Sequence, residues 1–182
     1  MRSVFSPEME ICEIGFAGGH FLEWLDDIGF RNLTGIEIRE GQYNKTSELF
    51  SQKHLGIRLI LGDVLNFDET FDGVYSTGLL QCLNTDSRLR FLDHVSKLAD
   101  LAFFTVPEII HSRNMESNQE IAVAGCKEFS TGNIAFELSE FYDSVRVGRM
   151  EKTILNNEDT FLYYICRKEK RALNTEFCVD CL

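Results

Sequence analysis

The chain has 182 residues, the length of one ordinary domain with room for a complete hydrophobic core. Hydrophobic residues make up 44% of it and charged residues 26%, a composition that excludes intrinsic disorder. The formal net charge of −11 disfavours nucleic acid as a partner, because an acidic surface repels phosphate.

The sequence indicates neither a membrane segment nor an export signal. No apolar run approaches the roughly 20 residues of a membrane-spanning helix. The N-terminus has a single positive charge and no apolar core of a signal peptide. We therefore expect no membrane partner and a cytoplasmic protein whose six cysteines stay reduced.

Strand-like and helix-like segments alternate along the chain. The order is a strand at 9–14, a helix at 21–28, a strand at 33–38, a helix at 41–53, strands at 57–61 and 71–76, a helix at 87–98, a strand at 101–106, a helix at 131–141, and strands at 143–150 and 160–166. We expect Pro107 to end the fifth strand. We also expect the apolar stripe of the first helix, Trp24 included, to lie in the core.

Strands that alternate with crossover helices predict a parallel sheet covered on both faces. Residues 156–159 leave no room for a crossover helix between the last two strands, so these strands form a hairpin. The predicted fold class is α/β: a doubly wound, mostly parallel seven-stranded sheet with a C-terminal antiparallel β-hairpin. We expect one domain over residues 1–168, followed by a tail at 169–182.

The most informative segment joins the first strand to the first helix, where residues 13–20 read EIGFAGGH. Gly15 permits a turn that a side chain would block. Small residues at 17–19 let backbone N–H groups approach a ligand at the helix N-terminus, where partial positive charge favours a carboxylate. Glu37 stands 22 residues after Gly15, where its carboxylate can accept both hydroxyl hydrogens of an adenosine ribose.

Two nucleotide-binding families share these features. The dinucleotide fingerprint requires glycines at its first, third and sixth positions, but Ala17 and His20 occupy the last two of these. The chain resembles instead the class I S-adenosylmethionine-dependent methyltransferases, whose first motif has an acidic residue followed by glycines at alternate positions. Glu13, Gly15 and Gly19 match that motif, and Ala17 departs from it at the middle position.

Three later segments resemble further motifs of that family in the right order. Residues 35–37 resemble its ribose-binding motif, residues 61–64 the loop whose acid binds the adenine amino group, and residues 71–78 the fourth-strand motif facing the methionine end. The resemblance covers about residues 9–168 and implies S-adenosyl-L-methionine as cofactor. It implies these cofactor-binding residues: Glu13, Gly15, Phe16, Ala17, Gly19, Glu37, Ile38, Asp63, Val64, Ser76 and Thr77.

Each motif taken alone has a plainer structural interpretation. Glycines after a strand often form only a tight turn, Glu37 could be a solvated carboxylate, and Asp63 could be a turn or cap residue. The occurrence of all four in order favours cofactor binding. Cys178 and Cys181 have metal-ligand spacing, but zinc needs four ligands and no second pair lies nearby, so we expect no metal site.

Groups on the acceptor side are expected in the loop after the fourth strand (77–83) and in the insertion at 108–127. The candidate catalytic residues are His111, Tyr75 and Gln81, although a solvated loop histidine is an alternative for His111. Many methyltransferases carry helices ahead of the first strand that roof the site. Here that strand begins near residue 9, so this roof is missing. Segment 108–128 could close the site, a partner subunit such as a second copy could close it, or the site could stay open.

Three functions remain open on the sequence alone. The first is a methyltransferase acting on a small molecule or a protein side chain. The second is a noncatalytic S-adenosylmethionine-binding or regulatory subunit. The third, motivated only by Gly15 and Glu37, is a nicotinamide-dependent dehydrogenase.

Overall fold

A computed structural model describes residues 1–108, 131–151 and 160–169. Within these residues, seven strands form one sheet in the order β3-β2-β1-β4-β5-β7-β6. The strands are β1 (Ile11–Ile14), β2 (Leu33–Glu37), β3 (Arg58–Leu61), β4 (Gly73–Thr77), β5 (Leu101–Glu108), β6 (Ser144–Glu151) and β7 (Thr160–Arg167). The first five pair in parallel, and β7 runs antiparallel to both β5 and β6. This arrangement confirms the predicted doubly wound sheet with its antiparallel pair.

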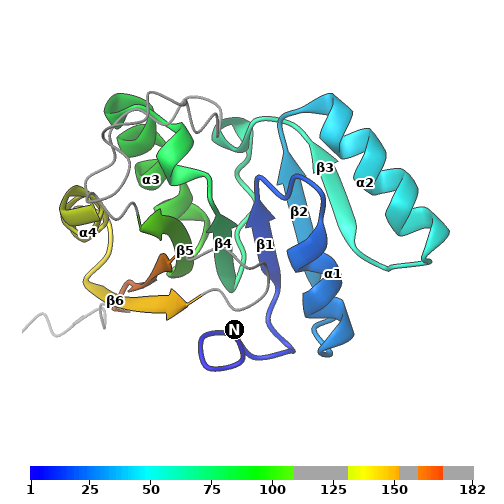
Figure 1. Ribbon diagram of the computed structural model, residues 1–182, viewed down its shortest axis with the longest axis horizontal. Helices are drawn as coiled ribbons and strands as arrows, with labels where there is room; N and C mark the ends of the chain where they lie inside the picture. Colours follow the sequence, from blue (N-terminus) through cyan, green and yellow to red (C-terminus); the bar gives the residue numbers. More distant parts are fainter. Residues whose placement is uncertain (109–130, 152–159, 170–182) are drawn as a thin grey trace, which may run out of the picture.

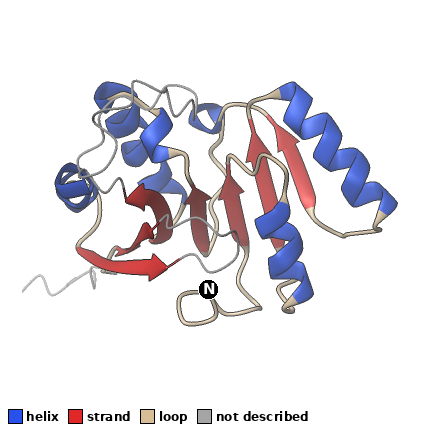
Figure 2. Ribbon diagram, viewed as in Figure 1, coloured by secondary structure: helices blue, strands red, loops and turns tan. Residues whose placement is uncertain are grey.

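Helices cover both faces of the sheet (Figures 1 and 2). They are α1 (His20–Asp27), α2 (Glu40–Gln52), α3 (Thr85–Leu98) and α4 (Thr131–Ser139), with short 3-10 turns η1 (Val64–Asn66) and η2 (Leu80–Cys82). Alternate residues of each strand point to opposite faces. On β4, Val74 packs in the cluster of α3 and α4, whereas Tyr75 packs in the cluster of α1 and α2. None of the helices in the described part of the chain is long and apolar enough to cross a membrane.

Two expectations from the sequence are wrong. Pro107 does not end β5, which continues to Glu108 opposite β7. The pairing with β4 ends at Thr105, so the missing N–H of Pro107 interrupts no bond on that side. Trp24 does not lie in the core: it is 42% exposed, because the short helix α1 buries Leu22 and Leu25 and leaves Trp24 on the flank of that stripe.

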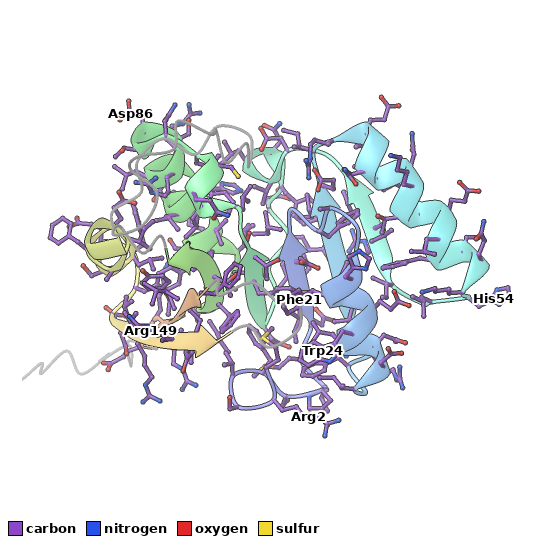
Figure 3. The ribbon with its side chains drawn as sticks, in the orientation of Figure 1. Arg2, Phe21, Trp24, His54, Asp86 and Arg149 are labelled. Carbon is purple, nitrogen blue, oxygen red and sulfur yellow. The ribbon has the colours of Figure 1, made fainter. Side chains whose placement is uncertain are left out.

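The N-terminal segment packs at the end of the sheet where the parallel strands begin (Figure 1). Phe5 is buried, and its ring lies so close to Gly73 that a Cβ there would stand 2.4 Å from it. The Arg2 guanidinium donates a hydrogen bond to the carbonyl of Ile28, just beyond α1. Figure 3 shows Arg2 below α1, which carries Phe21 and Trp24 with their rings edge to face at 5.9 Å. Residues 1–10 therefore brace the amino end of the sheet, away from the carboxyl ends of β1 and β4.

A buried ion pair links α3 to α4. Arg88 binds Glu137 through two parallel contacts, Nε to Oε2 at 2.5 Å and Nη2 to Oε1 at 2.6 Å, and both side chains are buried. Arg88 Nη1 also donates to the Leu83 carbonyl at 3.0 Å, at the end of the loop that follows β4. The pair thus joins two helices and one loop on the α3 face of the sheet.

Replacing Glu137 with alanine should lower the free energy of unfolding by about 3–5 kcal/mol, because the change leaves the Arg88 charge buried without its carboxylate. Urea denaturation of the two proteins measures the difference. Lys97→Ala is the matched control, since it breaks the exposed Lys97–Asp93 pair and should cost only about 0.3–0.5 kcal/mol. Equal losses in the two variants would contradict this assignment.

Candidate cofactor site

β2 and β3 lie on one side of β1, and β4 and β5 lie on the other, so the strand order reverses between β1 and β4. Two glycines shape the turn that follows β1. Gly15 has φ +77°, and its N–H donates to the Ile36 carbonyl of β2 at 2.8 Å. Gly19, at φ +71°, precedes α1, and a Cβ there would lie 2.6 Å from side-chain atoms of both Phe50 and Thr46. Both positions therefore need glycine, and the turn exposes its backbone at the carboxyl edge of the sheet.

Ala17 occupies the apex of this turn in a left-handed conformation, φ +46°. Its N–H donates to Glu37 Oε2 at 2.9 Å, and its carbonyl accepts a hydrogen bond from Thr46 Oγ1 at 2.8 Å. The turn is thus fastened on one side to the end of β2 and on the other to α2. The left-handed conformation is sterically unfavourable for a residue with a Cβ. The two hydrogen bonds help to hold Ala17 in it.

Glu37 is only 2% exposed and lies at the end of β2. Besides the contact from Ala17, its Oε1 accepts from the N–H of Arg39 at 2.9 Å and from Arg39 Nε at 3.2 Å. Burial by itself raises the pKa of Glu37, but the hydrogen bonds from Arg39 and Ala17 outweigh it, so the pKa lies below its ordinary value. The carboxylate is therefore ionised at neutral pH.

Glu13, on β1, is also buried, but its pKa is shifted in the opposite direction. Its Oε2 accepts a hydrogen bond from the Tyr75 hydroxyl at 2.9 Å. Burial raises the pKa of Glu13 to about 8; the Tyr75 hydrogen bond opposes the rise, while the charge of nearby Glu37 adds to it. Glu13 is thus mostly neutral at pH 7 and ties β1 to β4 beneath the glycine turn.

The β3 side of the site combines apolar side chains with one carboxylate. Ile38 is 63% exposed directly after Glu37, and the exposed Leu61 pairs with Glu37 across the β2–β3 ladder. Asp63 follows and caps η1, with Oδ1 accepting from the Leu65 N–H at 3.0 Å. The site therefore has an apolar surface bordered by two carboxylates.

At the end of β4, the two predicted hydroxyl residues, Ser76 and Thr77, differ in their burial. Ser76 is buried and donates to the Ile14 carbonyl at 2.8 Å, so its hydroxyl joins β4 to β1. Thr77 is partly exposed at the strand end. Gly78 follows with φ +67°, and its N–H donates to the Thr105 carbonyl at 3.1 Å.

The structure brings the predicted cofactor residues together, but not every side chain faces the site. Phe16 and Val64 are buried. The candidate catalytic residue Tyr75 is wholly inside the α1–α2 cluster, which leaves it no surface for an acceptor. Gln81 lies in η2, beside the end of β4. His111 and most of the predicted 108–127 insertion fall outside the described residues.

Sequence reasoning missed three contributors: Arg39, Thr46 and Leu61. Arg39 could have been suspected, because a cation two residues after a buried carboxylate is well placed to pair with it. Leu61 directly precedes the Gly62–Asp63 pair, and its exposure could not be read from the sequence. Thr46 had no signal at all, since it is 29 residues from Ala17 and belongs to a polar helix.

The family described as methyltransferase domain matches residues 11–100, which extend from β1 to the end of α3. That range contains the glycine turn, Glu37, Asp63 and the end of β4. No curated protein matches the sequence.

Several solved structures resemble the fold. The PH0226 protein of Pyrococcus horikoshii OT3 has a TM-score of 0.69 and 15% identity, covering 88% of this chain and 82% of that one. Magnesium protoporphyrin IX methyltransferase of Synechocystis PCC 6803 with bound SAM has a TM-score of 0.65 and 16% identity, and the match covers 88% of this chain and 71% of that one. A SAM-dependent methyltransferase of Aquifex aeolicus has a TM-score of 0.62 and 17% identity, and the match covers 91% of this chain and 92% of that one.

Residues 11–100 therefore carry a methyltransferase domain, and the strand order and the glycine turn with its carboxylate agree with the class I S-adenosylmethionine-dependent methyltransferases that the sequence resembles. S-adenosylmethionine, rather than a nicotinamide dinucleotide, is therefore its cofactor. In the part of the chain that the structure describes, no cluster of three or more His, Cys, Asp or Glu side chains could hold a metal ion.

Ala17→Gly should raise the free energy of unfolding by about 0.5–1 kcal/mol, because glycine adopts the left-handed conformation without the penalty borne by alanine. Thermal or urea denaturation measures the change. Ala135→Gly in α4 is the control and should lower stability by about 1 kcal/mol, since glycine disfavours a helix. A loss of stability in Ala17→Gly would show that the turn does not depend on this conformation.

Stability should depend on pH through Glu13. With a pKa raised from 4.5 to about 8, its favourable contribution is complete below about pH 4.5 and is lost as the pH rises towards 8. Relative to Glu13→Gln, the wild-type protein should therefore lose a few kcal/mol between pH 5 and 8, approaching about 1.4 kcal/mol per pH unit. Urea denaturation of both proteins at four pH values tests this, and a constant difference would mean that Glu13 titrates normally.

Proposed function

We propose that this enzyme transfers a methyl group from S-adenosylmethionine to a small molecule or an accessible protein side chain. The observation that carries the proposal is the ionised Glu37 carboxylate at the end of β2, fixed against the backbone of the glycine turn. That combination supplies an acceptor for ribose hydroxyls beside N–H groups that suit a carboxylate. The acidic net charge of −11 argues against nucleic acid as the acceptor.

The residues present fit the cofactor. Glu37 would hold the ribose, and Arg39 Nε is the donor that a ribose hydroxyl would replace, since its 3.2 Å contact is the longest of the three and its side chain is 61% exposed. Ile38 and Leu61 offer exposed apolar surface to a flat adenine ring. Asp63 keeps Oδ2 available for an amino group while Oδ1 caps η1.

The bound cofactor supplies an activated methyl group on a positively charged sulfur. The chain has to align the acceptor with that methyl group and keep water out. Glu13 serves this alignment indirectly, because in its neutral form it accepts from Tyr75 and holds β4 against β1. No general base is required where the acceptor loses its proton to solvent after transfer.

Other features of the chain stay predictions. These are the single domain over residues 1–168 with its tail, the cytoplasmic location, and coverage of the site by a second copy or another subunit. Each can be tested independently of the cofactor.

Glu37→Gln should weaken binding of S-adenosylmethionine and of S-adenosylhomocysteine by about 1.5–3 kcal/mol, which is roughly 10-fold to 150-fold in Kd. Calorimetric titration measures both ligands. The amide oxygen can still accept the Ala17 N–H, so the turn should remain folded. Glu40→Gln removes one exposed negative charge nearby and should leave both affinities unchanged.

The same titration tests the proposal as a whole. Binding of both ligands by the wild-type protein, with the product form comparable or tighter, would support it. Failure of the wild-type protein to bind either one would overturn it. Unchanged affinity in folded Glu37→Gln would remove Glu37 from the ribose site.

A further inference from the structure

Strand β7 is fully covered on one face of the sheet and partly bare on the other. On the α3–α4 face, Tyr164 and Cys166 are completely buried in the cluster that contains α4. On the α1–α2 face, the alternate residues Tyr163 and Ile165 are only half-buried. Figure 1 shows α4 beside β6, whereas α1 and α2 lie on the β1–β3 side of the sheet. The described residues thus leave part of one face of β7 exposed, although a doubly wound sheet normally buries both faces.

The cover on the α1–α2 face ends at β4. Tyr75 is fully buried there, because the rings of Phe21 and Phe5 lie against it at centroid distances of 6.3 and 6.5 Å. Its neighbour on β5, Phe103, is 8% exposed and stacks on the Tyr163 ring of β7 at 5.9 Å. Burial on this face therefore decreases from β4 outwards to β7.

The partly bare area has an apolar floor and a positively charged border. We call it the β7 platform and define it by Phe103, Tyr163, Ile165, Arg146 and Arg167. Ile165 pairs with Phe103 on one side and with Arg146 on the other, so these three side chains point to the same face. The Tyr163 ring extends the floor over β6, where it leaves no room for a Cβ on Gly148. Both arginines of the platform are exposed.

Helix α1 carries the complementary side chains on the flank that Phe21 occupies. Trp24 is 42% exposed, and its ring lies edge to face against Phe21 at 5.9 Å (Figure 3). Asp27 follows three residues later, so it shares the flank of Trp24, and it is also exposed. Phe21, Trp24 and Asp27, here called the α1 ridge, thus present an aromatic surface beside a negative charge.

We propose that the β7 platform binds the α1 ridge of a second copy of this chain, in a dimer with two-fold symmetry. Helices α1 and α2 raise one half of this face, and the half formed by β5, β7 and β6 stays low. A two-fold axis places the raised half of each copy on the low half of the other, so every contact occurs twice. The contact lies on a face of the sheet and not at its carboxyl edge, so it is independent of the proposed function.

The chemistry of the two surfaces favours a second copy over other occupants. Trp24 would rest on the apolar floor at Tyr163 and Ile165, and aromatic anchors of this kind dominate the affinity of protein interfaces. Asp27 would meet the platform's arginines. Two molecules that each carry a net charge of −11 repel one another, so their association needs opposite charges matched locally, and the ridge and the platform supply them.

Sedimentation equilibrium of the purified chain measures the dissociation constant of the dimer. The wild-type protein should self-associate reversibly. Trp24→Ala should raise the dissociation constant at least about tenfold, because it removes an aromatic anchor at two symmetric places. Phe136→Ala is the matched control, since Phe136 is 68% exposed on α4 and lies outside both surfaces, and it should leave the constant unchanged.

Charge variants test the platform and the ridge separately. Arg146→Glu should raise the dissociation constant roughly tenfold, because an attraction becomes a repulsion at two places. Arg90→Glu changes the net charge equally on the exposed surface of α3 and should have far less effect. Asp27→Arg makes the molecule less negative, which reduces overall repulsion, yet it should weaken the dimer by placing arginine against arginine. Asp86→Arg makes the same change far from α1 and should not weaken it (Figure 3).

A dimer that Trp24→Ala, Arg146→Glu and Asp27→Arg weaken, and that the three controls do not, supports the proposal. Wild-type protein that stays monomeric at all concentrations overturns it and would leave the platform to a different, acidic partner. A dimer that Arg146→Glu leaves unchanged also overturns it, because the ridge would then bind elsewhere. All six substitutions are at exposed side chains, so each variant should fold, and circular dichroism checks this.

Discussion

The hydrogen bond from the Ala17 N–H to Glu37 joins the ends of β1 and β2, and the remainder of the site is arranged around it. It fixes the apex of the glycine turn and holds the carboxylate in a defined position. It also helps to keep Glu37 ionised although the side chain is almost fully buried. Because the two strands are neighbours in a parallel sheet, one contact aligns the backbone donors and the carboxylate at the same edge.

Two buried acids close together would repel each other if both were charged, and the fold resolves this by treating them differently. Glu37 is surrounded by N–H donors and the Arg39 guanidinium, which stabilise its anion. Glu13 is held in the apolar α1–α2 side of the sheet with the Tyr75 hydroxyl, and burial keeps it protonated. The negative charge is thus confined to the ligand-facing position, and the second acid serves as a neutral brace.

The features that could be predicted from the sequence are those written in short segments. Alternating strands and helices, the short joint before the last strand, and the spacing from Gly15 to Glu37 are local patterns, and they lead to the doubly wound sheet with its hairpin and to the cofactor. The contacts that could not be predicted join distant segments. Thr46 binds the turn from α2, Arg88 pairs with Glu137 across 49 residues, and Tyr75 donates to Glu13 on the neighbouring strand. Only folding brings these distant residues together.

The neutral state of Glu13 also alters the charge that the folded molecule carries. The formal value of −11 counts every carboxyl group as ionised. With a pKa of about 8, Glu13 retains its hydrogen in most molecules at pH 7, so the native protein is less negative by nearly one charge than its unfolded chain. Unfolding at neutral pH therefore releases close to one proton to the buffer from this residue, and part of the heat measured in calorimetric unfolding belongs to the buffer that takes it up.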